Sequence, residues 1–126
     1  MRDRRNGFTL VELLIVVVII GLLATIVVPK FGSSRDKAFV TSMKADLRNL
    51  VTQQEAYMAD SGRYATGFPT TVWRTTTGVT GPTIATTVDG WTASVGHTST
   101  TRTCVIYIGS TSLAPATKEG VPTCTP

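Results

Sequence analysis

The pattern of hydrophobic residues is most regular at the start of the chain. From Phe8 to Val28 almost every residue is apolar, and Glu12 is the single charged side chain in that run. About 20 apolar residues in a helix span the hydrocarbon core of a bilayer, which is about 30 Å thick. The pattern therefore predicts a helix that is apolar on all sides and long enough to cross a membrane.

The next stretch keeps helical spacing but becomes amphipathic. Apolar and neutral residues recur at steps of three and four, while lysines and arginines face elsewhere. Pro29 cannot donate a backbone hydrogen bond, so a bend is expected there, and Gly21 weakens the preceding turns. The predicted helix ends near Asp60, where Gly62 is a suitable cap. The stripe comprises Phe39, Met43, Leu47, Leu50, Gln54, Tyr57 and Met58.

After Ser61 the composition changes. Nineteen of the last 66 residues are Thr, and Gly and Pro separate short β-branched runs, a mixture that favours strands. Asp89-Gly90 predicts a turn, and Gly96–Thr101 predicts a longer loop. A short strand or a loop is expected at Val72–Arg74, and an irregular tail at Gly109–Pro126. The predicted strands are Val79–Thr87, Trp91–Val95 and Cys104–Ile108. Because Val105 to Ile108 are all apolar, both faces of the last strand are expected to be partly covered.

Charge and candidate ligands exclude several functions. The formal net charge is +4, of which the first seven residues supply +2, leaving a charge too small and dispersed for specific nucleic-acid binding. His97 is the only histidine and has no partner at metal-ligand spacing, so no metal and no cofactor are expected. Ser94, His97 and Asp89 lie in one predicted hairpin without the context of a catalytic nucleophile, so an enzyme is not expected.

The two cysteines, Cys104 and Cys124, lie in the Thr-rich part. Arg2, Arg4 and Arg5 precede the apolar run, and positive charge favours the cytoplasmic side of a membrane, which places the rest outside the cytoplasm. There, two thiols in a small domain favour a disulfide, which stabilises by about 3 kcal/mol for a loop of this size. The alternative is two unpaired small apolar side chains.

The segment Gly7-Phe8-Thr9-Leu10-Val11-Glu12 follows a short basic leader. This arrangement resembles the signal of type IV pilins and type II secretion pseudopilins, closely over about the first half of the chain and loosely beyond it. The resemblance implies a prepilin peptidase that cuts after Gly7 and methylates the new amino terminus on Phe8. Glu12 then becomes the fifth residue of the mature chain, where the family has its glutamate.

The resemblance implies an α+β fold in which a long bent amino-terminal helix packs on a small antiparallel meander. The expected divisions are a leader at residues 1–7, an apolar transmembrane or filament-core half-helix at 8–29, an amphipathic half-helix at 30–60 and a Thr-rich sheet with its tail at 61–126.

The resemblance also implies a function. We expect a structural subunit of a type IV pilus, inserted in the inner membrane and polymerised by the pilus assembly machinery into a homo-oligomeric extracellular filament. A type II secretion pseudopilin is the alternative, and a signal-anchored surface protein that binds a ligand is a third. The cysteine pair favours the pilin, because it resembles the disulfide-bounded region of many pilins.

Two features of the apolar run have competing interpretations. Glu12 could attract the amine of Phe8 on a neighbouring subunit, since opposite charges in apolar surroundings favour that register, or it could be a tolerated interfacial glutamate. Gly21 and Pro29 could allow close helix packing in a membrane. By resemblance to pilins, they could instead let the helix lose hydrogen bonds in a filament, with Thr25 satisfying carbonyls that are left without donors.

Overall fold

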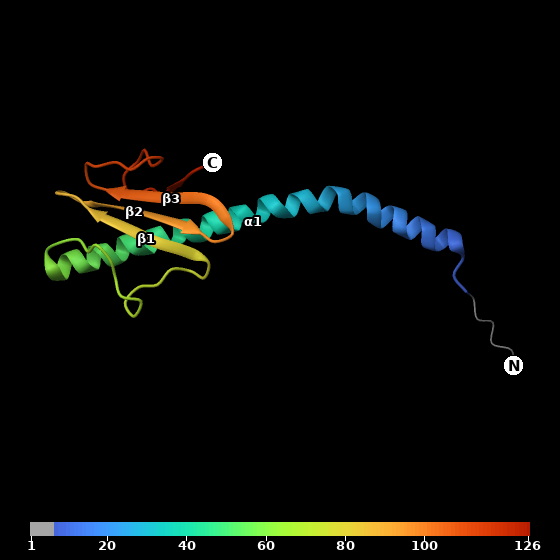
Figure 1. Ribbon diagram of the computed structural model, residues 1–126, viewed down its shortest axis with the longest axis horizontal. Helices are drawn as coiled ribbons and strands as arrows, with labels where there is room; N and C mark the ends of the chain where they lie inside the picture. Colours follow the sequence, from blue (N-terminus) through green and yellow to red (C-terminus); the bar gives the residue numbers. More distant parts are fainter. Residues whose placement is uncertain (1–6) are drawn as a thin grey trace. The chain divides into compact units, whose positions relative to one another are not determined.

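The computed structural model describes residues 7–126 and contains one helix and four strands. Helix α1 runs from Leu10 to Ser61 and includes Pro29. Contacts divide the chain after Arg35 into two compact units, each of which is described by itself. The long helix and the antiparallel sheet confirm the predicted α+β fold (Figure 1).

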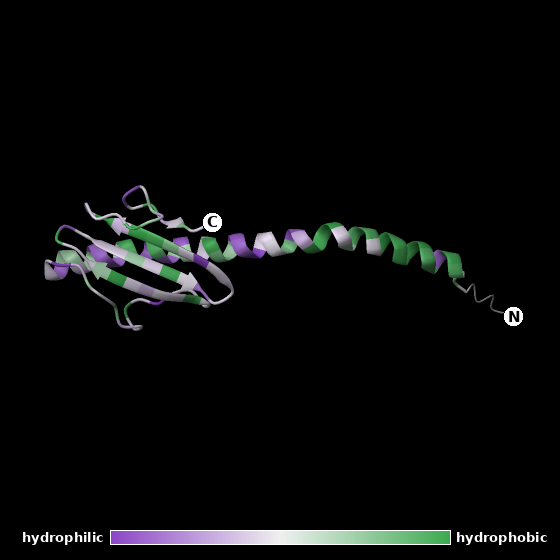
Figure 2. Ribbon diagram, turned by 45° about the horizontal axis from the view of Figure 1, so that its top comes forward, coloured by the Kyte–Doolittle hydropathy of each residue, from purple (hydrophilic) through white to green (hydrophobic). Residues whose placement is uncertain are grey.

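The first unit is the amino-terminal part of α1. Its large apolar side chains are all exposed, from 43% at Val27 to 79% at Phe8, and Figure 2 shows that this part of the helix is almost uniformly apolar. Length and composition make α1 a candidate membrane span. The helix continues across Gly21 and Pro29, so neither residue ends it, and the bend expected at Pro29 stays a prediction.

The second unit contains a four-stranded antiparallel meander in the order β1-β2-β3-β4. Strand β1 is Val79–Thr86, β2 is Trp91–His97, β3 is Thr100–Ile108 and β4 is Thr123–Cys124. The first three strands lie beside the carboxyl-terminal part of α1 (Figure 1). The predicted strands are therefore confirmed, although β2 and β3 extend further toward each other than expected. No strand forms at Val72–Arg74, which lies in the loop before β1.

The turns of the meander depend on small residues. Gly90 lies so close to the Ile108 carbonyl that a Cβ would overlap it, and Gly109 has a φ of 96°. The longer loop expected at Gly96–Thr101 is wrong, because His97 pairs with Thr100 and only two residues form the turn. The predicted turn at Asp89-Gly90 is present between β1 and β2.

The core of the second unit joins one stripe of α1 to one face of the sheet. Met43, Leu47 and Leu50 on the helix are fully buried. Opposite them, the strands contribute buried side chains: Val79, Trp91, Ala93, Val95, Cys104 and Ile106. The predicted stripe is thus confirmed at its centre, whereas Phe39, Tyr57 and Met58 are only partly buried.

Strand β3 is covered on both faces, as its apolar run predicts. Cys104 and Ile106 belong to the core that faces the helix, while Val105 between them is also buried, at 4% exposure. The carboxyl-terminal tail runs beside β3 (Figure 1), and Ala116 of that tail is buried. The Gly120 amide donates to the Tyr107 carbonyl over 2.9 Å, which attaches the tail to the strand.

The tail is more ordered than the sequence suggests. Its last residues form β4, in which Cys124 pairs with Cys104 and Thr123 pairs with Val105. The structure joins the two cysteines by a disulfide, as predicted. The Thr125 amide also donates to the Thr103 carbonyl over 2.9 Å, so the bridge is one of several attachments of the tail.

Two buried polar side chains of α1 hold the loop between the helix and the sheet. Gln54 donates to the Ala65 carbonyl over 2.7 Å and accepts from the Ala65 amide over 2.9 Å. Asp46, 3% exposed, accepts from the amide and the hydroxyl of Thr76, each over 2.8 Å. Because buried polar groups need partners, these bonds fix both ends of the loop on the helix.

Candidate assembly site

Glu12 lies in the first turn of α1, where it closes a capping box with Thr9. The Thr9 amide donates to the Glu12 carboxylate over 2.8 Å, and the Thr9 hydroxyl donates to the same oxygen over 3.0 Å. In return, the Glu12 amide donates to the Thr9 hydroxyl over 3.2 Å. This reciprocal pattern satisfies donors at a helix start that would otherwise lack partners.

The capping box changes the predicted start of the helix and adds a residue to the site. The helix begins at Leu10 instead of Phe8, and Thr9 precedes it as the cap. The spacing of Thr9 and Glu12 is the capping signature, so the sequence already contained the signal for this role of Thr9. The carboxylate thus has polar partners in its own chain before any second subunit is considered.

No cation neutralises Glu12 within the part of the chain that the structure describes. No lysine or arginine nitrogen of residues 7–126 lies within 4.0 Å of its carboxylate, and its neighbours along the helix are exposed apolar side chains such as Leu13 and Ile15. A carboxylate in apolar surroundings is stabilised by an opposite charge. The arrangement therefore leaves room for a cation from outside the described residues.

Gly7 and Phe8, the predicted cleavage and methylation positions, lie in irregular backbone before the helix. Both are exposed, and a Cβ added at Gly7 would meet no atom within 4 Å. An enzyme that cuts a backbone needs such an accessible segment. The first six residues, including Arg2, Arg4 and Arg5, lie outside the described residues.

The region around Pro29 is held by side-chain hydroxyls. The Thr25 hydroxyl donates to the Leu22 carbonyl over 2.7 Å. Pro29 has no amide hydrogen for the carbonyl of Thr25, and the role expected for the Thr25 hydroxyl in a filament stays a prediction. Further along, the hydroxyls of Ser33 and Ser34 both donate to the Lys30 carbonyl, over 3.2 and 3.1 Å.

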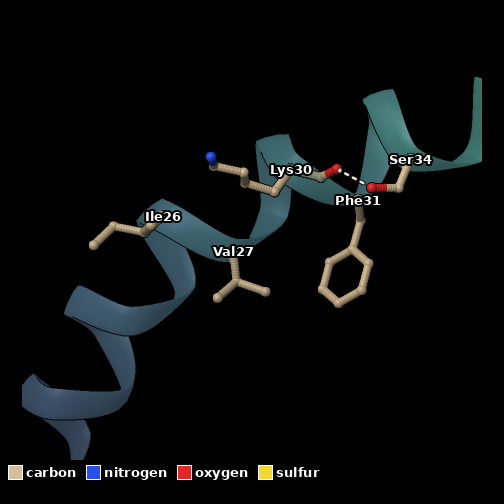
Figure 3. A pocket seen from close by; sticks show the side chains of 5 residues that line it. All are labelled: Ile26, Val27, Lys30, Phe31 and Ser34. Carbon is tan, nitrogen blue, oxygen red and sulfur yellow. Dashed lines mark hydrogen bonds between the residues drawn. The ribbon is translucent and has the colours of Figure 1, made fainter. Parts of the chain in front are cut away.

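A shallow hollow lies on the helix beside this region (Figure 3). Its volume is about 180 Å³, and it is lined by Ile26, Val27, Lys30, Phe31 and Ser34. Val27 and Phe31 point to one side of the helix, while the Lys30 side chain extends back toward Ile26. Lys30 is the first positively charged residue after the long apolar run.

The second unit holds His97 in a structural position. The His97 ring stacks on Phe39 with centroids 4.2 Å apart, and its Nδ1 accepts a hydrogen bond from the Ser99 amide over 3.1 Å. It lies at the end of β2 and not in a loop. Among residues 7–126 no group of three potential metal ligands occurs.

Asp89 does not join His97 in a catalytic arrangement. Its carboxylate accepts from the Ser110 amide over 2.9 Å, and hydrogen bonding from Ser110 holds the pKa of Asp89 below its usual value. Asp89 therefore attaches the start of the tail to the turn between β1 and β2.

Similarity to known proteins extends over about half of the chain. The family described as "Prokaryotic N-terminal methylation motif" matches residues 2–28. The chain is 41% identical over 63 residues to the type II secretion system core protein G of Pseudomonas aeruginosa, which covers 50% of this chain and 44% of that protein. It is 40% identical over 62 residues to the type IV major pilin protein PilA of Myxococcus xanthus, covering 49% of this chain and 28% of PilA.

The matched part spans less than half of each of these relatives. No solved structure matches the chain. Over about half of its length, the chain is therefore similar to type IV pilins and to type II secretion core proteins.

Proposed function

We propose that the chain is a structural subunit of a type IV pilus filament, with no enzymatic role. The observation that carries this proposal is the contrast between the exposed apolar side chains of the first unit and the single carboxylate at its start. Exposed apolar surface of this extent needs lipid or protein to cover it. A contact between different surfaces of identical subunits repeats without closing and produces a filament.

The proposed life cycle uses the predicted divisions of the chain. Residues 1–7 are a leader on the cytoplasmic side, residues 8–29 anchor the precursor in the inner membrane, and residues 30–60 carry the sheet and tail of residues 61–126. A prepilin peptidase cuts after Gly7 and methylates Phe8, and the pilus assembly machinery then moves the subunit into the extracellular filament. Gly21 and Pro29 supply flexibility to the apolar half-helix.

Glu12 is the proposed assembly residue. During polymerisation it exchanges part of its capping box for the methylated amine of Phe8 on a neighbouring copy. Both groups carry charge into apolar surroundings, where an ion pair of good geometry offsets much of the desolvation cost and an unpaired charge does not. The pair therefore selects one axial register of the incoming subunit.

The test is a comparison of surface filaments in the native host. Deleting the gene should abolish the filaments, and restoring the natural sequence should return them. Gly7→Leu should leave the chain in the membrane with its leader attached and without filaments, because a larger side chain obstructs the peptidase. Gly67→Leu, at an exposed glycine with open space for a side chain, is the matched control for processing and should be cleaved normally. Filaments of normal number in the deletion strain would contradict the proposal.

A pseudopilin of a type II secretion system is the second candidate, favoured by the similarity to core protein G. The same deletion strain distinguishes the two. Loss of long surface filaments with normal secretion of folded proteins supports the pilin, whereas loss of that secretion with surface filaments retained supports the pseudopilin.

A further inference from the structure

The hollow around Lys30 lies at a definite depth along the proposed membrane helix. The helical part of the apolar run, from Leu10 to Val28, contains 19 residues, which at 1.5 Å per residue is about 29 Å, close to the thickness of the hydrocarbon core. Lys30 follows this run by two residues. When the leader faces the cytoplasm, Lys30 therefore lies at the headgroup level of the opposite leaflet.

The Lys30 ammonium has no partner of its own in the described part of the chain. No carboxylate oxygen of residues 7–126 lies within 4.0 Å of it, and the side chain is exposed. The neighbouring hydroxyls of Ser33 and Ser34 donate to the Lys30 backbone carbonyl, and neither is bonded to the ammonium in the described residues. An ammonium at the edge of a hydrocarbon layer is stabilised by an anionic partner.

The direction of the Lys30 side chain indicates how deep in the membrane an anionic partner of its ammonium would lie. Side chains of a helix lean toward its amino terminus, and Figure 3 shows Lys30 extending back toward Ile26, which belongs to the apolar run. The ammonium is thus displaced toward the hydrocarbon layer and away from bulk water. Phe31, 62% exposed, adds apolar surface beside Lys30 at the same level.

We propose that Lys30 binds the phosphate of an anionic phospholipid in the extracytoplasmic leaflet, with an acyl chain lying in the hollow beside Val27 and Phe31. Phosphate is the anion present at this depth, whereas the carboxylates of a second copy occupy the bilayer only at Glu12, near the other face. This inference rests on the proposed membrane insertion of the precursor. It gives the anchor a lipid preference and fixes the depth from which the subunit is extracted.

The test uses the full chain, incorporated into membrane nanodiscs of mixed phosphatidylglycerol and phosphatidylcholine and released for native mass spectrometry. The ratio of the two lipids retained on the protein is measured against the ratio in the discs. A lysine near an anionic membrane surface changes binding by about fivefold, so the natural chain should retain phosphatidylglycerol with about that enrichment. Lys30→Gln should abolish the enrichment, and Lys30→Arg should keep it.

Arg35→Gln is the matched control. It removes the same charge from the same unit, about 7–8 Å further along the helix axis at 1.5 Å per residue, and should leave most of the enrichment intact. Equal retention of both lipids by the natural chain would overturn the proposal. An equal loss in the Lys30 and Arg35 variants would also overturn it, because the effect would then be diffuse surface charge. Carbodiimide cross-links from Lys30 to a second copy, without lipid enrichment, would instead assign the hollow to protein.

Failure of this proposal and failure of the proposed function remain distinguishable. The lipid ratio is measured on dispersed subunits and needs no filament, while the filament counts of the Gly7→Leu and deletion strains do not depend on which lipid surrounds the anchor. Filaments without lipid enrichment would overturn only the inference about Lys30.

Discussion

Helix α1 passes through two regions that differ in how far their apolar side chains are covered. In the second unit, Met43, Leu47 and Leu50 have no exposed surface because the sheet of the same chain covers them. In the first unit, Leu13, Leu14 and Ile15 remain 51–57% exposed although they are equally apolar. The difference shows that the second region covers its apolar side chains with residues of the same chain, whereas those of the first are left uncovered by residues 7–126.

The largest expected effect is in the first region. Glu12→Ala should leave insertion and processing intact, because removal of a charge makes the membrane segment more apolar. An incoming Phe8 amine would then be buried without its counter-charge, at a cost of about 3 kcal/mol or more, so filament yield should fall by about a hundredfold or more.

The measurement is filament yield by electron microscopy alongside the membrane pool of processed subunit. Glu12→Gln, which keeps the size but not the charge, should fail in the same direction. Normal filaments from both variants would show that Glu12 has no role in assembly. Loss of the membrane pool together with the filaments would point to a processing defect instead.

The comparison between the two regions can be tested with the same substitution in each. Leu47→Ala should lower the free energy of unfolding of the second unit by about 2–5 kcal/mol, since a buried leucine leaves a cavity. Leu14→Ala should leave that free energy unchanged, because Leu14 is 53% exposed in the other unit. Chemical unfolding of the detergent-dispersed chain checks both, followed by tryptophan fluorescence, to which the buried Trp91 and the half-buried Trp73 of the second unit contribute. Equal changes in the free energy of unfolding for the two variants would contradict the proposed difference between the two units.

The disulfide is expected to contribute the next largest effect within the second unit. Replacing Cys104 and Cys124 together by Ser should reduce the free energy of unfolding by about 3 kcal/mol, because the unfolded chain is no longer constrained. Reduction of the natural chain should produce the same shift, measured by unfolding with and without dithiothreitol. If reduction leaves the midpoint unchanged, the bridge does not stabilise the unit.

Asp46 should have a smaller effect. Asp46→Ala leaves the Thr76 amide and hydroxyl without their acceptor, so the second unit should lose about 1–3 kcal/mol of stability. Asp36→Ala, an exposed carboxylate on the same helix, is the control and should change little. Limited proteolysis should also cut the loop before β1 faster in the Asp46 variant. Identical cleavage of both variants would show that the hydrogen bonds between Asp46 and Thr76 do not hold the loop.

The smallest effect concerns pH. Because hydrogen bonds from Ser110 lower the pKa of Asp89 in the folded chain, its stabilising contribution is present above the unfolded pKa, about 4, and is lost as the pH falls through the folded pKa. The difference in melting temperature between the natural chain and Asp89→Asn should therefore shrink from pH 6 to pH 3. A difference that grows toward low pH would reverse the assigned direction.

The sequence was most informative where one periodicity continued for many residues. The stripe through Met43 and Leu47 follows from helical spacing, the apolar run from its unbroken length, and the three main strands from β-branched runs separated by Gly and Pro. Asp46 could not be predicted to be buried, since its partner Thr76 is 30 residues away and a carboxylate within an apolar stripe reads as solvent-exposed. The capping box at Thr9 was present in the sequence as local spacing.

Short elements were harder to predict from the sequence, because they too depend on contacts between distant residues. Strand β4 has only two residues, lies next to Pro122 and has no alternation, so its pairing with β3 depends on contacts with residues far away in the sequence. The turn after His97 was predicted too long because polar threonines continue the strand on its exposed face. For the candidate site, the motif identified Gly7, Phe8 and Glu12, while their roles depend on subunits outside the single chain.

Mass spectrometry of the natural chain isolated from the cell surface tests the central claim most directly. We expect an amino-terminal peptide that begins with N-methylated Phe8, in protein recovered from sheared filaments. A chain that retains its leader, or one that begins beyond Pro29, would contradict the account, because the apolar half-helix would then not be the processed assembly segment.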